Sequence, residues 1–309
     1  MIEMLRTPES RFYGLPDFPF NPNYVEVNGA RMHYLDEGTG EVILCLHGEP
    51  TWSFLYRKMI LPLRKQYRVV VPDFYGFGRS DKFTRQKDYS FYMHYLSLLK
   101  FIEKTELKDI TLVVQDWGGL IGLSVLGKRP ELFKRVVIMN TSLPVGNRPM
   151  PLAFRIWRAY SRLWPKFPLE KVMKMGCHKP VKKDVLHGYH APFPTEKYLV
   201  GARVWPQLVP TGKEDPGVKQ MTRAREVLKG WTKPALVMFS DKDPITRGAE
   251  KWFLNNIPSI KHEPLITIEG AGHFLQEDKG KLIAEHIHEF ILRSNSRELA
   301  DPSSKEGSD

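Results

Sequence analysis

The sequence of 309 residues lacks several features that mark specialised classes of protein. Its only two cysteines, Cys45 and Cys177, are too few for a disulfide framework or a zinc site built from cysteine. No apolar run approaches the roughly 20 residues that a membrane-spanning helix needs. The first fourteen residues contain no hydrophobic stretch of the kind found in secretory signals. We therefore expect a cytoplasmic protein with no membrane span and with both thiols reduced.

Glycine and proline are also sparse for a collagenous or low-complexity chain, at 23 and 24 residues. Hydrophobic residues make up 42% of the chain and charged residues 26%. This apolar share is large enough for a buried core, and the length fits one large domain or two ordinary ones.

Positive charge is concentrated in one part of the chain. Residues 151–235 hold 17 lysines and arginines and 6 acidic residues. The net charge of this segment therefore equals that of the whole chain, +11. A solvated helical surface is the plainest interpretation. A positive field over a site that handles anions is the alternative. We expect no nucleic-acid binding, because no basic helix with base-reading spacing occurs.

Short apolar, β-branched runs alternate with longer helical patterns, which predicts an α/β fold with a mostly parallel sheet and helices on both faces. The predicted strands are residues 24–27, 32–35, 42–46, 68–71, 110–114, 136–139, 234–239 and 264–268. The predicted helices are residues 54–65, 89–104, 120–128, 248–256 and 281–293. Asn28-Gly29 predicts a hairpin between the first two strands, which would form an antiparallel edge.

This alternation stops after the sixth strand and resumes with the seventh. The stretch between them is rich in proline, tryptophan, lysine and arginine and contains no clear strand. We therefore predict a core of residues 1–140 and 233–294, a helical cap of residues 141–232 inserted into it, and a disordered polar tail of residues 295–309.

Asp116 follows a predicted strand and precedes Trp117-Gly118-Gly119, where a helix begins. In the α/β-hydrolase pattern a sharp strand-to-helix turn at this place lifts a nucleophile above the sheet, and small neighbours make room for it. A helix-capping aspartate is the simpler interpretation of this residue alone. The upstream His47-Gly48-Glu49 favours the nucleophile, because a strand ending in His-Gly is typical of an oxyanion loop. The backbone N–H groups of Glu49 and Trp117 would form the oxyanion hole.

Two further residues complete a triad in the chain order nucleophile, acid, histidine. Asp243 follows the seventh strand, and glycines flank His273 after the last strand. An aspartate is ionised at neutral pH and attacks an sp³ carbon without a base to activate it. His273, oriented by Asp243, would then activate water against the resulting ester. The indole N–H of Trp117 is a donor that suits a departing halide.

With these residues in place, the chain resembles the haloalkane dehalogenases, in particular the subfamily that holds halide between two tryptophans. The shared stretches are Arg6-Thr7-Pro8, Phe20-Asn21-Pro22-Asn23-Tyr24, His47-Gly48-Glu49-Pro50-Thr51-Trp52, Pro72-Asp73-Phe74-Tyr75-Gly76-Phe77-Gly78, Gln115-Asp116-Trp117-Gly118-Gly119 and Ala191-Pro192-Phe193-Pro194. The resemblance implies the α/β-hydrolase fold, with an eight-stranded sheet and a cap after strand six. It also implies hydrolysis of carbon–halogen bonds by Asp116, Asp243 and His273.

The same resemblance implies Trp117 as the first halide donor and a second tryptophan in the first cap helix. Trp157 fits that position best, and Trp164 lies nearby. Asp241 is the only rival of Asp243 as the triad acid, but the Asp-Pro step after Asp243 matches the family.

Epoxide hydrolases share the fold and the aspartate nucleophile and use two cap tyrosines, for which Tyr160, Tyr189 and Tyr198 are candidates. Glu49 and Gln115 argue against this alternative, since epoxide hydrolases usually carry an aromatic residue and often a histidine there. A non-catalytic binding protein is the third interpretation. We expect a monomer acting on a small halogenated or epoxide substrate with water, and neither a cofactor nor a metal, because no cluster has ligand spacing.

Overall fold

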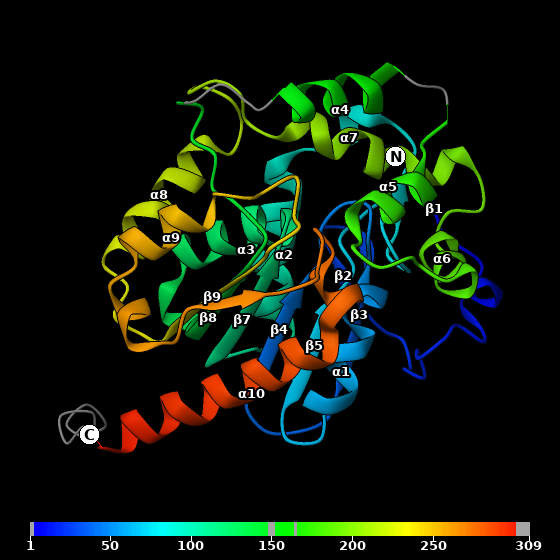
Figure 1. Ribbon diagram of the computed structural model, residues 1–309. Helices are drawn as coiled ribbons and strands as arrows, with labels where there is room; N and C mark the ends of the chain where they lie inside the picture. Colours follow the sequence, from blue (N-terminus) through cyan, green and yellow to red (C-terminus); the bar gives the residue numbers. More distant parts are fainter. Residues whose placement is uncertain (1–2, 148–151, 164–165, 301–309) are drawn as a thin grey trace.

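The computed structural model describes residues 3–147, 152–163 and 166–300. Its main sheet has eight strands in the order β10-β9-β8-β7-β4-β5-β3-β2 (Figure 1). The strands are β2 (Asn23–Val27), β3 (Ala30–Glu37), β4 (Val42–Leu46), β5 (Arg68–Pro72), β7 (Ile110–Gln115), β8 (Phe133–Met139), β9 (Ala235–Ser240) and β10 (Ile266–Ile268). All eight predicted strands are confirmed.

The sheet is parallel from β10 to β5 and antiparallel at the other edge. The central strands β7 and β9 are buried along their whole length, because helices cover both faces and the strands consist mainly of apolar residues. The hairpin of β2 and β3 turns at Asn28 and Gly29, whose φ angles are 53° and 78°. Two consecutive positive φ values are the signature of the hairpin turn that Asn-Gly predicts.

A second sheet joins β1 (Met4–Leu5) to β6 (Lys82–Phe83) in antiparallel pairing. We did not predict it, because strands of two residues are too short to show a period in the sequence.

Helices cover the two faces of the main sheet. On one face α1 (Arg57–Leu63) packs against α10 (Leu275–Ala300), and on the other α3 (Trp117–Lys128) packs against α2 (Phe91–Lys104). The helix α9 (Glu250–Asn256) packs beside β9. Short 3-10 turns lie at Glu9–Phe12, Ser53–Tyr56, Gln86–Asp88, Pro130–Leu132, Glu196–Leu199 and Pro258–His262. The five predicted core helices are therefore confirmed, with their ends shifted by several residues.

The insertion after β8 is helical, as predicted. It contains α4 (Leu152–Leu163), α5 (Leu169–Gly176), α6 (Lys183–His190), α7 (Val200–Leu208) and α8 (Val218–Lys229). In Figure 1, α4 and α7 lie above the sheet, whereas α8 lies lower, beside α9. The Arg223 guanidinium of α8 donates to the Gly127 carbonyl of α3 at 2.8 Å, and the backbone of Ala224 lies against Gly127. The helix α8, within the predicted cap of residues 141–232, therefore packs against a helix of the core.

The prediction of a disordered tail from residue 295 is wrong for its first six residues. They continue α10 as far as Ala300. Side chains of this helix end bind the core: Asn295 accepts from Arg135, and the Lys134 ammonium pairs with Glu298 at 2.9 Å. These contacts keep a polar segment helical, which composition alone does not reveal. Residues 301–309 lie outside the described part of the chain.

Among the described helices, none combines the length and the apolar character that crossing a lipid bilayer would require.

A buried ionic cluster joins the cap to the core below the predicted catalytic histidine. Glu277, near the start of α10, accepts from the Arg57 guanidinium at 2.6 and 2.8 Å and from the Lys58 ammonium at 2.7 Å. The hydroxyl of Tyr189 in α6 donates to the same carboxylate at 2.7 Å. Burial raises the pKa of Glu277, but the two cations outweigh it and hold the pKa at about 2. The cluster therefore anchors α6 to α1 and α10 as an ionised network.

We predict that Glu277→Gln lowers the free energy of unfolding by about 3 kcal/mol, because it leaves the buried Arg57 without a counter-charge. Glu170→Gln is the control, since Glu170 pairs with Lys174 on the surface, where such pairs contribute at most about 1 kcal/mol. Urea unfolding at pH 7 measures both variants. The Glu277 contribution exists above the unfolded pKa and should fade as the pH falls from about 4.5 towards 2. Equal losses in the two variants would contradict this account.

Candidate active site

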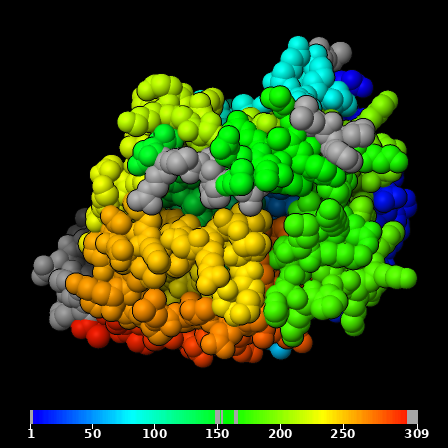
Figure 2. Space-filling model, turned by 45° about the horizontal axis from the view of Figure 1, so that its top comes forward, coloured from blue at the N-terminus to red at the C-terminus, as the bar shows by residue number. Residues whose placement is uncertain are grey.

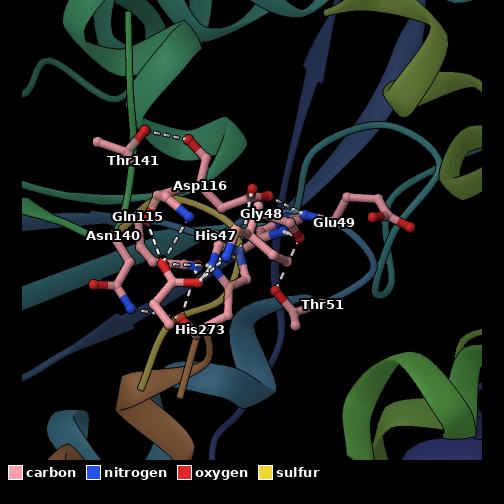
Figure 3. A network of polar contacts seen from close by, with 12 residues as sticks. His47, Gly48, Glu49, Thr51, Gln115, Asp116, Asn140, Thr141 and His273 are labelled. Atoms are coloured by element: carbon pink, nitrogen blue, oxygen red, sulfur yellow. Dashed lines mark hydrogen bonds and ion pairs between the residues drawn. The ribbon is translucent and has the colours of Figure 1, made fainter. Parts of the chain in front are cut away.

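Asp116 occupies a turn of one residue between β7 and α3, with φ 50° and ψ −127°. Positive φ is uncommon outside glycine, so the neighbouring structure has to hold this conformation. The Asp116 N–H donates to the Asn140 carbonyl at 3.0 Å, and the Thr141 hydroxyl donates to the Asp116 carbonyl at 2.7 Å (Figure 3). Both partners follow β8, so the adjacent strand fixes the turn.

Two glycines allow the turn to pack this closely. A Cβ at Gly118 would lie 2.1 Å from the Leu46 carbonyl oxygen, and one at Gly48 would lie 2.1 Å from Asp116 Oδ1. Neither distance is compatible with a side chain, because each is far shorter than a van der Waals contact. The geometry therefore requires Gly118, one of the two glycines that the sequence offered as room for the turn, and it also requires Gly48 of the oxyanion loop.

The loop after β4 places the backbone N–H of Glu49 2.8 Å from Asp116 Oδ1, as the sequence predicts for an oxyanion hole. The imidazole of His47 secures this loop, since His47 Nε2 accepts from the Phe74 N–H at 3.0 Å. The Glu49 side chain extends away from Asp116 (Figure 3). Burial, followed by the nearby charge of Asp116, raises the pKa of Glu49 well above its usual value. Trp117, whose backbone N–H is the other predicted donor, is the first residue of α3 and follows Asp116 directly in the chain.

His273 lies between the two predicted carboxylates. Its Nδ1 is 3.1 Å from both oxygens of Asp243, and its Nε2 is 3.3 Å from Asp116 Oδ2. The Asp243 carboxylate is held in turn by the backbone N–H of Ile245 at 2.8 Å and by the Thr246 hydroxyl. The structure thus brings Asp116, Asp243 and His273 together from three separate segments of the chain.

The two carboxylates control the charge of the imidazole. Burial lowers the pKa of His273, but Asp243 and Asp116 together outweigh it and raise the pKa to about 10. Burial raises the pKa of Asp243, and the charge and hydrogen bond of His273 bring it down to about 2. The two aspartates therefore favour the protonated form of the His273 imidazole.

Asp241, the rival of Asp243 as the triad acid, has another role, and so does Asn140. Asp241 accepts from the Gly270 N–H at 2.8 Å and shapes the loop before His273 instead of touching its ring. The Asn140 amide donates to the carbonyls of Gly272 and His273, each at 3.1 Å. Asn140, at the end of β8, thus supports the histidine loop without supplying a negative charge.

Gln115, the last residue of β7, was not predicted to have a part in the site. Its buried Nε2 lies 3.2 Å from His273 Nε2 and 3.2 Å from the His273 carbonyl oxygen. In the sequence it served only as a mark against epoxide hydrolases. Its position next to Asp116 was the available signal, because a residue that ends the nucleophile's strand faces the histidine loop.

The two predicted halide tryptophans have different surroundings. Trp117 is almost fully buried, and its ring centroid lies 5.0 Å from that of Trp205 in α7. The Trp205 indole N–H donates to His94 at 2.7 Å, so this tryptophan supports Trp117 and is not free to bind an anion. Trp157 in α4 is partly buried, with its ring against Tyr160 and Phe167. No described ring contact joins Trp157 to Trp117, and Trp164 lies outside the described residues.

The site opens towards the surface between cap and core. The Asp116 side chain is 19% exposed, whereas that of His273 is 2% exposed. Figure 2 shows a hollow between the green atoms of the cap and the yellow-to-orange segment after β9. A carboxylate reached from outside, with an oxyanion donor and a buried base beside it, can displace a leaving group from a small substrate. The ester that forms on the carboxylate can then be cleaved by water.

Three comparisons with known proteins agree on one family. Residues 41–280 match the family model described as alpha/beta hydrolase fold. The haloalkane dehalogenase of Mycolicibacterium paratuberculosis is 45% identical over 93% of this chain and 97% of its own length. That of Psychrobacter cryohalolentis is 42% identical over 94% of this chain and 98% of its own. The solved tetrameric haloalkane dehalogenase of Paraglaciecola agarilytica superposes with a TM-score of 0.86 at 40% identity, covering 92% of this chain and 97% of that one.

We predict that Asp243→Asn lowers the pKa of His273 by about 1 to 3 units, because it removes a charge in direct contact with the ring. An NMR titration of the labelled imidazole measures the shift. Asp241→Asn is the matched control and should leave the pKa of His273 unchanged, since Asp241 binds the loop before His273 and the Lys242 ammonium instead of the ring. A lower pKa in the control, with no change in Asp243→Asn, would reverse the assignment of the acid.

Proposed function

Because the chain belongs to the haloalkane dehalogenases, which hydrolyse carbon–halogen bonds within the α/β-hydrolase fold, we propose that Asp116 is the nucleophile of this reaction. A single observation carries the assignment: the carboxylate at the β7–α3 turn faces the amide of Glu49 on one oxygen and His273 on the other. Asp116 Oδ1 accepts the hydrogen bond from the Glu49 N–H, so Oδ2 is the oxygen that attacks the carbon. The carbon–halogen bond breaks as the ester bond forms, and halide leaves.

In the second step His273 acts as the base. Its Nε2 removes a proton from a water molecule, and the resulting hydroxide attacks the carbonyl carbon of the Asp116 ester. Negative charge then develops on Oδ1, where the backbone N–H of Glu49 stabilises it. Collapse of this intermediate expels the alkoxide, which takes the proton from the imidazolium and leaves as the alcohol. The carboxyl group of Asp116 then loses its proton to solvent, which restores the carboxylate. Asp243 stabilises the imidazolium that forms between these events.

The indole N–H groups of Trp117 and Trp157 are the proposed donors to the departing halide. A halide gains charge as it leaves, so donors in a dry site stabilise the transition state more than the bound substrate. Burial of Trp117 against Trp205 supports a fixed donor beside the nucleophile. Trp157 would contribute its donor from the cap.

Tyr189, one of the three candidate cap tyrosines, gives little support to epoxide opening. The Tyr189 hydroxyl donates to Glu277 inside the ionic cluster, and burial followed by the charge of Glu277 raises the pKa of Tyr189 well above its usual value. A phenol held in this way is a poor acid for an epoxide oxygen. The identity to haloalkane dehalogenases favours the same conclusion.

Small haloalkanes are the substrates that fit the family. The sequence suggested a monomer, whereas a relative at 40% identity is described as a tetramer. We propose that the single chain carries the complete reaction, because every proposed catalytic group belongs to one chain.

We predict that His273→Phe traps the alkyl ester. The first displacement needs only Asp116, whereas hydrolysis needs the imidazole. After mixing with 1,2-dibromoethane, the intact mass should rise by one bromoethyl group on the Asp116 peptide. The double variant with Asp116→Ala should stay unmodified. Steady halide release by His273→Phe without any adduct would contradict the ester mechanism.

We predict that Trp157→Phe slows turnover of bromoalkanes about tenfold to a hundredfold, which corresponds to about 1.4–2.8 kcal/mol of lost transition-state stabilisation. The variant keeps an aromatic ring and loses the donor. Bromide quenching of tryptophan fluorescence should weaken in parallel. Trp252→Phe is the control, since Trp252 lies in α9 against Phe253. Unchanged turnover and quenching in Trp157→Phe would exclude this residue from the halide site.

A further inference from the structure

Two groups with opposite preferences face the same atom of the catalytic histidine. Asp116 Oδ2 lies 3.3 Å from His273 Nε2, and Gln115 Nε2 lies 3.2 Å from it (Figure 3). The carboxylate is an acceptor and favours a proton on this nitrogen. The amide nitrogen is a donor and favours a bare lone pair. Both cannot be satisfied in one protonation state.

We propose that Gln115 is a positioning residue that holds His273 as a neutral base once Asp116 has become an ester. The proposal rests on the two-step function proposed above and adds a residue to its second step. In the free enzyme the negative charge of Asp116 outweighs the amide donor of Gln115 and favours a proton on His273 Nε2. After alkylation the carboxylate has lost its charge, and the donor of Gln115 remains.

The orientation of the Gln115 amide follows from the backbone. Gln115 Nε2 also donates to the His273 carbonyl oxygen at 3.2 Å. A flipped amide would place its oxygen against that carbonyl, where two acceptors would repel. Gln115 is fully buried, and its Oε1 has no hydrogen-bond partner among the described residues. The two donor hydrogens therefore divide between the carbonyl and the imidazole.

The charges around His273 make this bias necessary. Asp243 faces Nδ1 from the loop after β9, and Asp116 faces Nε2 from the β7–α3 turn. Glu49, from the loop after β4, is the third acid near the ring, and burial favours its neutral form. Asp243 and Asp116 raise the pKa of His273 to about 10, which favours the protonated ring over the neutral base.

Alkylation removes one of these two opposing charges at the moment when a base is needed. The imidazolium then releases the proton on Nε2 to solvent water more readily, because only Asp243 still stabilises the charged form. The Nδ1–H stays directed at Asp243, and the Nε2 lone pair accepts from Gln115 and can accept from water. Gln115 thus favours the neutral, basic form of His273 once Asp116 has lost its charge.

Gln115→Met tests the proposal, because methionine has a similar volume and no donor. The enzyme should be mixed with a bromoalkane so that the alkyl-enzyme forms. Rapid-quench measurements should then give the rate of alcohol formation from it as a function of pH. Loss of one hydrogen bond to the neutral ring should move the midpoint of this profile upward by about 0.4 to 1 pH unit. Below the midpoint, hydrolysis should slow about threefold to tenfold, and at high pH it should return to the wild-type plateau.

The halide burst of the first step should be unchanged in Gln115→Met, since displacement does not need the base. Gln276→Met is the matched control: Gln276 is a fully buried glutamine of the histidine segment that is not hydrogen-bonded to the imidazole. Its midpoint should not move. An equal loss of rate at every pH in Gln115→Met, or an unchanged midpoint, would overturn the proposal. Loss of the halide burst itself would instead count against the function of Asp116.

Discussion

The backbone conformation of Asp116 is the constraint on which the site depends. A φ of 50° in a residue other than glycine costs about 1–3 kcal/mol and persists only where the surroundings hold it. Here the hydrogen bonds to Asn140 and from Thr141 provide that hold, and Gly48 and Gly118 leave space that no side chain could leave. The strain places a carboxylate beyond the end of the sheet, facing donors and base at once.

The same arrangement explains how one histidine serves two chemically different steps. Before displacement, an imidazolium beside Asp116 offsets its charge. The displacement does not require a neutral histidine, because the carboxylate needs no base. Afterwards the ester carries no charge, and the balance at Nε2 shifts towards the neutral ring. The buried cluster of Glu277, Arg57 and Tyr189 begins four residues beyond His273, so the anchor of the cap also restrains the catalytic loop. The ionic cluster therefore connects the core and the cap to the loop that carries His273.

The sequence predicted the fold and the triad because both follow from local patterns. Buried β-branched runs predicted every strand of the main sheet. The chain order of Asp116, Asp243 and His273, each after a predicted strand, predicted that these three residues would come together. Features that depend on distant contacts were missed. The ordering of Asn295 by Arg135, the packing of α8 on α3 and the amide of Gln115 against His273 all join segments far apart in the chain. Trp205 gave no signal for the same reason, since its role comes from the ring of Trp117 and the imidazole of His94.

The central claim, an ester on Asp116 that water cleaves at its carbonyl carbon, has a direct isotopic test. A single turnover of excess enzyme with a bromoalkane in H2-18O should place the heavy oxygen in the carboxylate of Asp116, because the alcohol takes its oxygen from the enzyme. Mass spectrometry of the Asp116 peptide should then show a gain of 2 mass units, with unlabelled alcohol. Labelled alcohol from that first turnover, with an unlabelled peptide, would mean that water attacks the substrate carbon directly and would contradict the account.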